Sequence, residues 1–346
     1  MPETMWHTVL TEPEHFEREQ TEIAEPNEGQ VLIEVSHVGI CGSDIAAYHG
    51  EHPHITCPIT LGHEFSGTVA RQGPDEQGPQ PGTRVTIIPH EPCRDCHGCR
   101  AGMYNRCDEL KVIGCQAPGA FAQYVVVPAD MALPIPDEMS MEQAAMVEPG
   151  AVAVHAAGRA ELDGGETVCV MGAGPIGNFT MQALKSAGAG TVVISDLDQS
   201  RLELAQNLGA DAAINVGEQH LEDALDNLVG GAREIDLWVD CVGHGGGPLD
   251  TALGLARRGT DILLVGVLAA DYESKNLINV SEHELRIIGT TMYTPADYET
   301  TIELLSGGDI RTEGMVKQRY GADKVAEAFA MIEAGDRDFF KVMIVR

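Results

Sequence analysis

The segment that most constrains the fold lies at residues 167–196 and reads TVCVMGAGPIGNFTMQALKSAGAGTVVISD. The apolar run Thr167–Met171 predicts a buried parallel strand, and a G-x-G-x-x-G motif follows it at the mouth of a helix. A second apolar strand is predicted at residues 192–195, and Asp196 follows it about 20 residues beyond the motif. An acidic residue at this position of such units binds the adenosine ribose. The segment therefore predicts a dinucleotide-binding unit.

Each glycine of the motif has a physical role. Gly172 permits a tight turn, Gly174 lets the backbone approach a pyrophosphate at the helix N-terminus, and Gly177 allows close helix–strand packing. An acid at the ribose favours NAD over NADP, so we predict NAD as the cofactor. The predicted cofactor-binding residues are Gly172, Gly174, Pro175, Ile176, Gly177, Asp196, Arg201, Val242 and Val265.

Strands and helices alternate beyond this unit, which is typical of a parallel sheet with helices on both faces. The fold class is therefore α/β, with a doubly wound sheet. Predicted strands are 191–196, 212–216, 235–241, 261–265 and 287–291, and predicted helices are 199–208, 221–228 and 248–256. Near the start of the chain, a polar lead-in precedes a predicted strand at 31–38, and another strand is predicted at 121–127. After the alternating segment, the sequence predicts helices at 297–305 and 324–332 and a closing strand at 341–345.

Length and charge bound the function. A chain of 346 residues suits two domains, and a formal charge of −31 disfavours nucleic acid and anionic membranes as partners. Lysine is scarce, with six against sixteen arginines, and the acids are spread along the chain, which favours a salt-adapted surface over an ordinary acidic enzyme. With no signal peptide or long apolar span in the sequence, we expect a cytoplasmic protein.

Three short motifs carry candidate ligands for a catalytic metal. Cys41 lies in GICGSD at the end of a predicted strand, His63 and Glu64 lie in LGHEFSGTV, and Glu148 lies in MVEPGAVAVHA. Each residue alone is more often a buried structural side chain. Together, Cys41, His63 and Glu148 with one open position predict a catalytic zinc site, because three protein ligands leave room for water or substrate.

A second metal site is predicted at C-x2-C-x2-C-x7-C within EPCRDCHGCRAGMYNRC. Four thiolates so close in sequence can close tetrahedrally on one zinc ion, which would tie down a long lobe. An iron–sulfur cluster is the alternative. The predicted ligands of this structural zinc are Cys93, Cys96, Cys99 and Cys107, which makes two zinc ions per chain.

GICGSD, LGHEFSG, the four-cysteine lobe, EPGAVAVHA and GAGPIG, in this order, resemble the zinc-dependent medium-chain dehydrogenases. The resemblance covers nearly the whole chain and is strongest to the polyol branch, which includes sorbitol, butanediol and threonine dehydrogenases. It implies a GroES-like β-rich catalytic domain at 1–149, completed by 292–346, and a Rossmann domain at 150–291. It also implies that Cys41, His63 and Glu148 bind the catalytic zinc, that Glu64 lies beside the zinc and in relatives binds it directly or through water, and that Ser43 passes on the alcohol proton.

Two positions depart from the family pattern. Ala46 stands where relatives often have a proton-relay histidine, which leaves His49 as a substitute, and Met292 stands where polyol enzymes often carry an arginine. The resemblance implies an NAD-dependent dehydrogenase of a secondary alcohol in a polyol, vicinal diol or sugar-derived substrate, assembled as a homodimer or homotetramer. The alternatives are a non-catalytic nucleotide-binding protein, a dehydrogenase or reductase of non-polyol substrates, and a zinc-free quinone or enoyl reductase.

Overall fold

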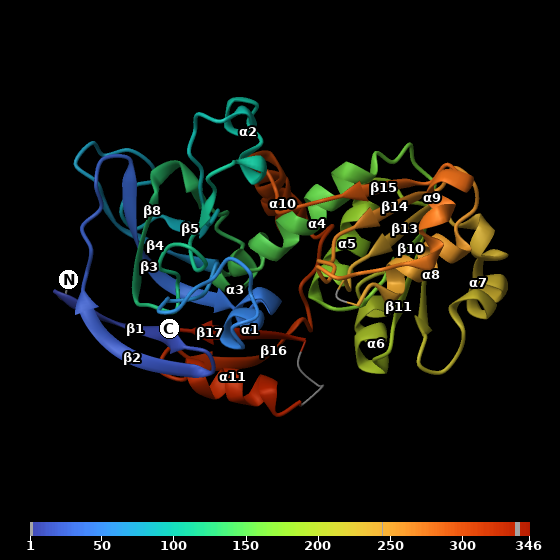
Figure 1. The fold of residues 1–346 in the computed structure, drawn as a ribbon. Coiled ribbons are helices and arrows are strands. Elements are labelled where there is room, and N and C mark those ends of the chain that lie inside the picture. Colours follow the sequence, from blue (N-terminus) through green and yellow to red (C-terminus); the bar gives the residue numbers. More distant parts are fainter. Residues whose placement is uncertain (1–2, 244, 336–339) are drawn as a thin grey trace. The chain divides into compact units, whose positions relative to one another are not determined.

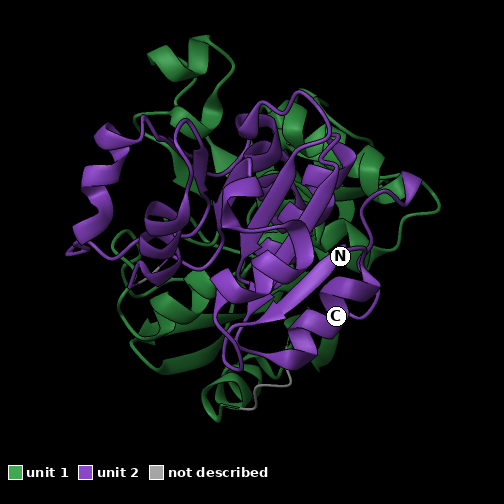
Figure 2. Cartoon of the chain, turned by 90° about the vertical axis from the view of Figure 1, so that its right-hand side faces the viewer, with its two compact units in different colours: residues 1–148, 294–306, 316–346 green, residues 149–293, 307–315 purple. Residues whose placement is uncertain are grey.

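The computed structural model describes residues 3–243, 245–335 and 340–346, which form two compact units. Figure 2 colours them separately. Unit 1 comprises Met1–Glu148, Thr294–Ser306 and Val316–Arg346, and unit 2 comprises Pro149–Tyr293 and Gly307–Met315. The chain passes from unit 1 to unit 2 within α4 (Val147–Ala160).

Unit 2 is built on a six-stranded sheet in the order β12-β11-β10-β13-β14-β15. Every pairing is parallel, and this order is that of a Rossmann sheet. The predicted doubly wound sheet is therefore confirmed. The strands are β10 (Thr167–Met171), β11 (Thr191–Asp196), β12 (Ala212–Asn215), β13 (Leu237–Asp240), β14 (Asp261–Leu264) and β15 (Arg286–Gly289).

Helices of unit 2 bury apolar side chains against this sheet. Cys169 and Met171 of β10 join one apolar cluster with side chains of α7 and α8. Val168 and Val170 alternate with them, are equally buried, and so face the opposite side of the sheet. The helices are α5 (Pro175–Ser186), α6 (Gln199–Asn207), α7 (Leu221–Val229), α8 (Gly247–Leu255) and α9 (Ile278–Glu282), with short 3-10 turns η3 (Ala232–Glu234) and η4 (Lys275–Leu277).

The glycine-rich turn joins β10 to α5 as its sequence requires. Gly172 has φ +100°, a conformation that side chains rarely adopt. Gly174 is the N-cap of α5, with Pro175 in its first turn. A Cβ on Gly177 would clash with the carbonyl oxygen of Gly172, so only glycine permits this approach of helix and turn.

Unit 1 is mainly β. Its seven-stranded sheet runs β16-β17-β3-β4-β5-β9, with β8 also paired to β3. Figure 1 shows β17, from the end of the chain, beside β3, from near its start. The strands of this sheet are β3 (Gln30–Gly39), β4 (Glu64–Gln72), β5 (Arg84–Ile87), β8 (Tyr124–Pro128), β9 (Ala132–Pro134), β16 (Val316–Gly321) and β17 (Lys341–Val345).

Smaller elements complete unit 1. The two-stranded pairs are β1 (Thr4–Glu12) with β2 (His15–Glu22), and β6 (His90–Glu91) with β7 (Lys111–Val112). The helices are α1 (Gly42–Tyr48), α2 (His97–Arg100), α3 (Met141–Ala145), α10 (Pro295–Gly307) and α11 (Val325–Glu333), with 3-10 turns η1 (Tyr104–Arg106) and η2 (Ala129–Met131). Within the described ranges, no helix is both long and apolar enough to cross a membrane.

The structure differs from the sequence-based expectation in several places, of which three bear on the architecture. The polar lead-in contains the β1–β2 hairpin, whose second strand is mostly exposed and so lacks a clear apolar alternation. Strand β16 was not predicted, since three consecutive residues of its six, Lys317, Gln318 and Arg319, are polar or charged and exposed. Residues Gly307–Met315 belong to unit 2 rather than to the C-terminal part of unit 1, because the backbone of Arg311 exchanges two hydrogen bonds with the side chain of Gln182.

Candidate active site

Three predicted ligands meet at one end of β3 and β4. Cys41 is the N-cap of α1, which follows β3, whereas His63 immediately precedes β4 and Glu64 begins it. Glu64 pairs with Gly39 in the antiparallel register of the two strands, which brings the three together. Their ligand atoms all lie within 4.8 Å of one another, and His63 and Glu64 are buried. Thiolate, imidazole and carboxylate form a donor set that suits zinc.

Asp44, the last residue of the GICGSD motif, orients this group. Its side chain is fully buried, and one carboxylate oxygen accepts a hydrogen bond from the backbone N–H of Cys41 at 2.8 Å. The other oxygen lies 3.6 Å from Nδ1 of His63. Burial lowers the pKa of His63, but the charges of Asp44 and Cys41 together raise it by more than burial lowers it. The pKa of His63 therefore lies well above its usual value. Asp44 and Cys41 therefore stabilise positive charge on the His63 ring.

Lys341 is a member of this group that the sequence analysis did not predict. It is 4% exposed, and Nζ donates to the carbonyl oxygen of Ile40 at 3.0 Å and forms an ion pair with Glu64. Burial lowers the pKa of Lys341, whereas Glu64, Cys41 and Glu148 raise it, with a net increase. A Cβ on Gly39 would clash with the Glu64 carboxylate, so this glycine makes room for the pair. The sequence signal was a lysine heading the apolar run KVMIV.

Glu148 lies near this group but not within it. Its side chain is 8% exposed in the first turn of α4, and its charge raises the pKa of both Lys341 and Tyr298. Glu64 also raises the pKa of Tyr298, so the two carboxylates face a common region. The ligand atoms that lie within 4.8 Å of one another are those of Cys41, His63 and Glu64, and Glu148 stays a predicted ligand.

The two predicted proton-transfer residues lie on α1. Ser43 is half-buried in its first turn, two residues after Cys41. His49 is its C-cap, with Nδ1 3.5 Å from Glu14 and Nε2 3.1 Å from Glu333. Although burial lowers the pKa of His49, these carboxylates raise it overall, and the structure does not group His49 with the metal ligands.

Further side chains surround His63 that sequence reasoning did not single out. Burial and, secondarily, the charge of His63 lower the pKa of His90 to about 4. Burial also lowers the pKa of His52, which is influenced by His63 and Asp44. The thiol of Cys115 contributes a hydrogen bond that raises the pKa of His63. His90 begins β6 and the other two lie in separate loops, so no local motif predicts their proximity.

The four-cysteine cluster forms as predicted. The sulfur atoms of Cys93, Cys96, Cys99 and Cys107 lie within 4.8 Å of one another, and all four residues are free thiols. The backbone N–H of Cys93 donates to Sγ of Cys107 at 3.2 Å. Backbone hydrogen bonds lower the pKa of Cys96 to about 6, whereas burial raises that of Cys99 to about 12. The cluster offers four sulfur donors to one ion.

The nucleotide motif of unit 2 borders a cavity of about 990 Å³. Its lining includes Gly172, Asp196, Arg201 and Val242, and predicted residue Val265 is not among the lining residues. Asp196 accepts hydrogen bonds from the backbone N–H groups of Ala173 at 2.6 Å and Asp198 at 2.9 Å. The acid is thereby fixed at the end of β11 with lone pairs remaining for ribose hydroxyls. Gly174, Pro175, Ile176 and Gly177 form the start of α5.

Comparison with known proteins identifies the two domains. Residues 27–137 match the family model described as the alcohol dehydrogenase GroES-like domain, and residues 175–307 match the one described as zinc-binding dehydrogenase. The first match covers most of the sheet of unit 1, and the second covers most of unit 2. The expected combination of a GroES-like domain with a Rossmann domain is thus confirmed.

Whole-length relatives are also found. The chain is 33% identical to sorbitol dehydrogenase of Bacillus subtilis over 99% of this chain and 98% of the relative. It is 33% identical to D-arabitol-phosphate dehydrogenase of Enterococcus avium over 93% and 91%, respectively. A solved structure described as a short chain alcohol dehydrogenase from E. coli CFT073, complexed with NADH, superposes with a TM-score of 0.92 at 31% identity over all of both chains. These likenesses favour an enzyme over a non-catalytic nucleotide-binding protein.

Proposed function

The chain belongs to the zinc-dependent medium-chain alcohol and polyol dehydrogenase family, and we propose that it transfers a hydride from a secondary alcohol of a polyol, vicinal diol or sugar-derived substrate to NAD. The observation that carries this proposal is the convergence of Cys41, His63 and Glu64, whose ligand atoms lie within 4.8 Å of one another. A donor set at the start of one strand and at a helix cap is suited to holding a metal while leaving a position for substrate.

These residues fit a catalytic zinc ion. Cys41 and His63 would hold it with a carboxylate from Glu64 or Glu148, and Asp44 would keep the His63 ring oriented from behind. When bound, zinc supplies Lewis-acid chemistry that lowers the pKa of an alcohol hydroxyl. Cys93, Cys96, Cys99 and Cys107 would hold the structural zinc.

Ser43 is the proposed acceptor of the alcohol proton. It lies two residues from Cys41, is half-buried, and has a hydroxyl that can accept one proton while donating another. His49 is a poor next carrier, because Glu14 and Glu333 favour its protonated form and face both ring nitrogens. We therefore propose that the proton passes from Ser43 to solvent without the His49 side chain.

NAD preference is supported by the cavity in unit 2. Asp196 is held there by two backbone N–H groups, in a position to accept hydrogen bonds from the adenosine ribose. A 2′-phosphate would place further negative charge against this carboxylate.

The decisive experiment is a screen of polyols, vicinal diols, sugars and simple alcohols for NADH formation by the zinc-loaded protein. Oxidation of a polyol or diol with a kcat/KM above that of ethanol is the expected result. If ethanol is the best substrate, the polyol assignment is wrong. Cys41→Ser should abolish the activity while leaving the thermal unfolding temperature nearly unchanged.

Three further properties are proposed. The formal charge of −31 supports adaptation to high salt, because screening relieves self-repulsion. Nine free cysteines, four of them gathered in one cluster, support a cytoplasmic location, since such thiols persist in a reducing compartment. The family supports a homodimer or homotetramer, which light scattering of the purified protein would test.

A further inference from the structure

A cavity of about 320 Å³ lies within unit 1, between the β1–β2 hairpin and the sheet strands β3 and β8. The described residues that line it belong to neither metal-binding group, and none of them lines the nucleotide cavity. We propose that this cavity binds a small organic cation with an apolar chain, an alkylammonium ion. The inference concerns a separate site and does not depend on the proposed function.

The hairpin forms one wall of the cavity because β1 is attached to the segment that leads into β8. The backbone N–H of Thr8 donates to the carbonyl oxygen of Phe121 at 2.8 Å, and that of Gln123 donates to the carbonyl oxygen of Trp6 at 3.1 Å. Side chains alternate along a strand. Met5 and His7 accordingly line the cavity, whereas Trp6 between them is 41% exposed.

The opposite wall is apolar. Leu32 of β3 and Tyr124 and Val126 of β8 line the cavity, and with Met5 they belong to an apolar cluster that is separate from the main core of unit 1. Ala122 adds a short side chain that leaves space open. A volume of about 320 Å³ lies in the range of small-molecule sites. These walls favour a ligand with an apolar chain, because its burial removes apolar surface from water.

The charge of the lining selects the sign of the ligand. Glu22, at the end of β2, and the half-buried Glu91 of β6 both line the cavity. Among the described lining residues none is a lysine or arginine, and no ion pair joins either carboxylate to a described cation. Two carboxylates without a cationic partner beside apolar walls complement an ammonium group on an alkyl chain, and they repel an anion.

Tyr124 adds a second attraction for a cation. Its ring centroid lies 5.1 Å from Cζ of Arg346, so this ring already accepts one cationic group. Arg346 does not line the cavity, and its Nη1 is paired with Glu34 at 2.7 Å. The nitrogens of His7 also face protein partners, since Nδ1 lies 3.0 Å from Oγ1 of Thr60 and Nε2 lies 3.8 Å from Glu19. Glu22, Glu91 and the Tyr124 ring are therefore the groups that we assign to the ammonium.

The test compares three probes that share a six-carbon chain: hexyltrimethylammonium, 1-hexanol and hexanoate. The quaternary nitrogen has no lone pair, so this cation cannot bind through it to a zinc ion. Calorimetry with the zinc-loaded, full-length protein would give the Kd and the stoichiometry of each probe. We expect one cation per chain, bound at least about tenfold more tightly than hexanoate, and a gap that narrows as KCl is raised toward 1 M.

Variants locate the binding in this cavity. Glu22→Gln and Glu91→Gln should each weaken binding of the cation at least about threefold and leave that of 1-hexanol unchanged. Ala122→Phe should fill the cavity and abolish binding of both. Glu28→Gln is the matched control, because it makes the same change of charge at a residue of unit 1 that does not line this cavity. It should leave the Kd of the cation at the wild-type value.

Three results would overturn the inference: no saturable binding of the cation, binding of hexanoate as tight as that of the cation, or an effect of Glu28→Gln as large as those of Glu22→Gln and Glu91→Gln. The two glutamine variants at the cavity keep the test decisive if Ala122→Phe fails to fold, which thermal unfolding would reveal. Because the assay measures binding and not turnover, a failure here leaves the proposed dehydrogenase intact, and an inactive enzyme leaves this inference intact.

Discussion

The ammonium of Lys341, on the last strand of the chain, is paired with the carboxylate of Glu64, the first residue of β4. Both side chains are almost fully buried, and Glu64 is also within ligand distance of Cys41 and His63. Glu64 therefore has two competing partners, a lysine and a metal ion. The ion pair links the C-terminal strand to the metal-binding group of unit 1.

Removal of Lys341 should destabilise the metal-free protein more than the zinc-loaded protein. Lys341→Met leaves the Glu64 carboxylate buried without its cation, a loss of about 3 kcal/mol or more in the free energy of unfolding. Bound zinc would offset part of this loss by attracting the same carboxylate. Urea unfolding with and without zinc would measure the difference. Lys324→Met, which breaks an exposed pair with Glu327, is the matched control and should change little. Equal effects of the two substitutions would contradict the prediction.

Metal analysis should find two zinc ions per chain, because the two ligand groups share no residue. Cys41→Ser should remove one zinc and the activity but leave the fold largely intact. Cys99→Ser should remove the other zinc and chiefly lower the thermal unfolding temperature, since this cluster ties down a long lobe. A stoichiometry of one in the wild-type protein purified without chelator would rule out the second site.

Sequence reasoning was most effective where a backbone requirement dictates the residue. Gly172 and Gly177 are needed by a left-handed turn and by a close backbone approach, so their spacing was sufficient to predict the unit around β10 and α5. The four cysteines were likewise predictable, because local spacing brings them together.

The residues that were missed depend on pairing between distant strands. Lys341 has no motif of its own and Asp44 lies in GICGSD, but their contacts with Glu64 and His63 appear only when β3 is placed beside β4 and β17. His49 was proposed for proton transfer because it is near Ala46 in sequence, but Glu14 and Glu333, far away in the chain, determine its surroundings. Long-range pairing of this kind cannot be read from local periodicity.

His90 should make the protein less stable as the pH falls from about 6.5 to about 4. Burial lowers its pKa to about 4 in the folded state, whereas the unfolded chain protonates near 6.5. Between these pH values the unfolded state binds more protons than the folded state. The contribution of His90 to the free energy of unfolding is therefore fully present above pH 6.5, and roughly 3 kcal/mol of it is lost as the pH falls to about 4.

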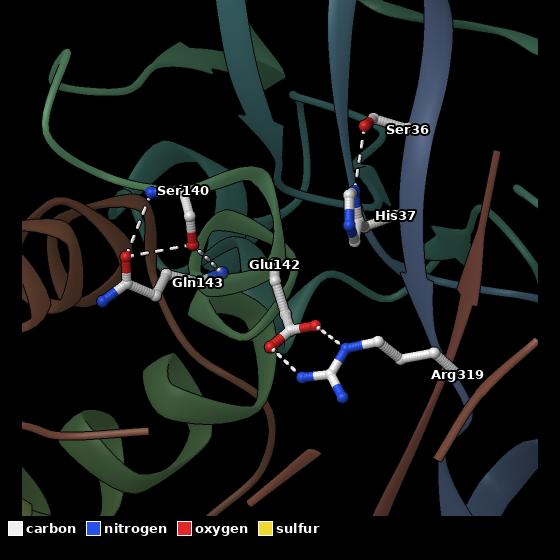
Figure 3. Close-up of polar contacts among 6 residues, drawn as sticks. All are labelled: Ser36, His37, Ser140, Glu142, Gln143 and Arg319. Carbon is white, nitrogen blue, oxygen red and sulfur yellow. Dashed lines mark hydrogen bonds and ion pairs between the residues drawn. The ribbon is translucent and has the colours of Figure 1, made fainter. Parts of the chain in front are cut away.

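The wild-type slope also includes other histidines. Burial lowers the pKa of His37, beside the Glu142–Arg319 pair in Figure 3, whereas that of His49 is raised, and the two act in opposite directions. The informative quantity is therefore the difference between wild type and His90→Gln in unfolding free energy across this pH range. His15→Gln, on exposed β2, should keep the wild-type slope. If His90→Gln also keeps the wild-type dependence of unfolding free energy on pH, His90 is not the residue that causes this dependence.

Stability should increase from low to molar salt. Acidic residues outnumber basic ones by 53 to 22, and their mutual repulsion is screened to a range of about 3 Å near 1 M ionic strength. Thermal unfolding in a KCl series would measure the effect. A melting temperature that stays flat or falls with added KCl would refute salt adaptation.

Asp196 should determine the preference for NAD over NADP. Its carboxylate lines the nucleotide cavity and is fixed by hydrogen bonds from the backbone N–H groups of Ala173 and Asp198. In NADP, a phosphate replaces the 2′ hydroxyl, so Asp196 would lose a hydrogen bond and meet like charge. The combined cost is a few kcal/mol, which corresponds to a preference of roughly tenfold to several hundredfold in kcat/KM.

Substitutions at two positions separate charge from hydrogen bonding in this preference. Asp196→Asn removes the charge but keeps an acceptor oxygen, and Asp196→Ala removes both, so the relative use of NADP should rise in both variants and more in the alanine variant. Arg201→Ala is the control: if Arg201 binds phosphates common to both cofactors, its loss should raise the KM of each similarly. All measurements need one salt concentration, because screening alone weakens the discrimination. Equal use of NAD and NADP by the wild type, or no relative gain for NADP in either Asp196 variant, would show that another residue selects the cofactor.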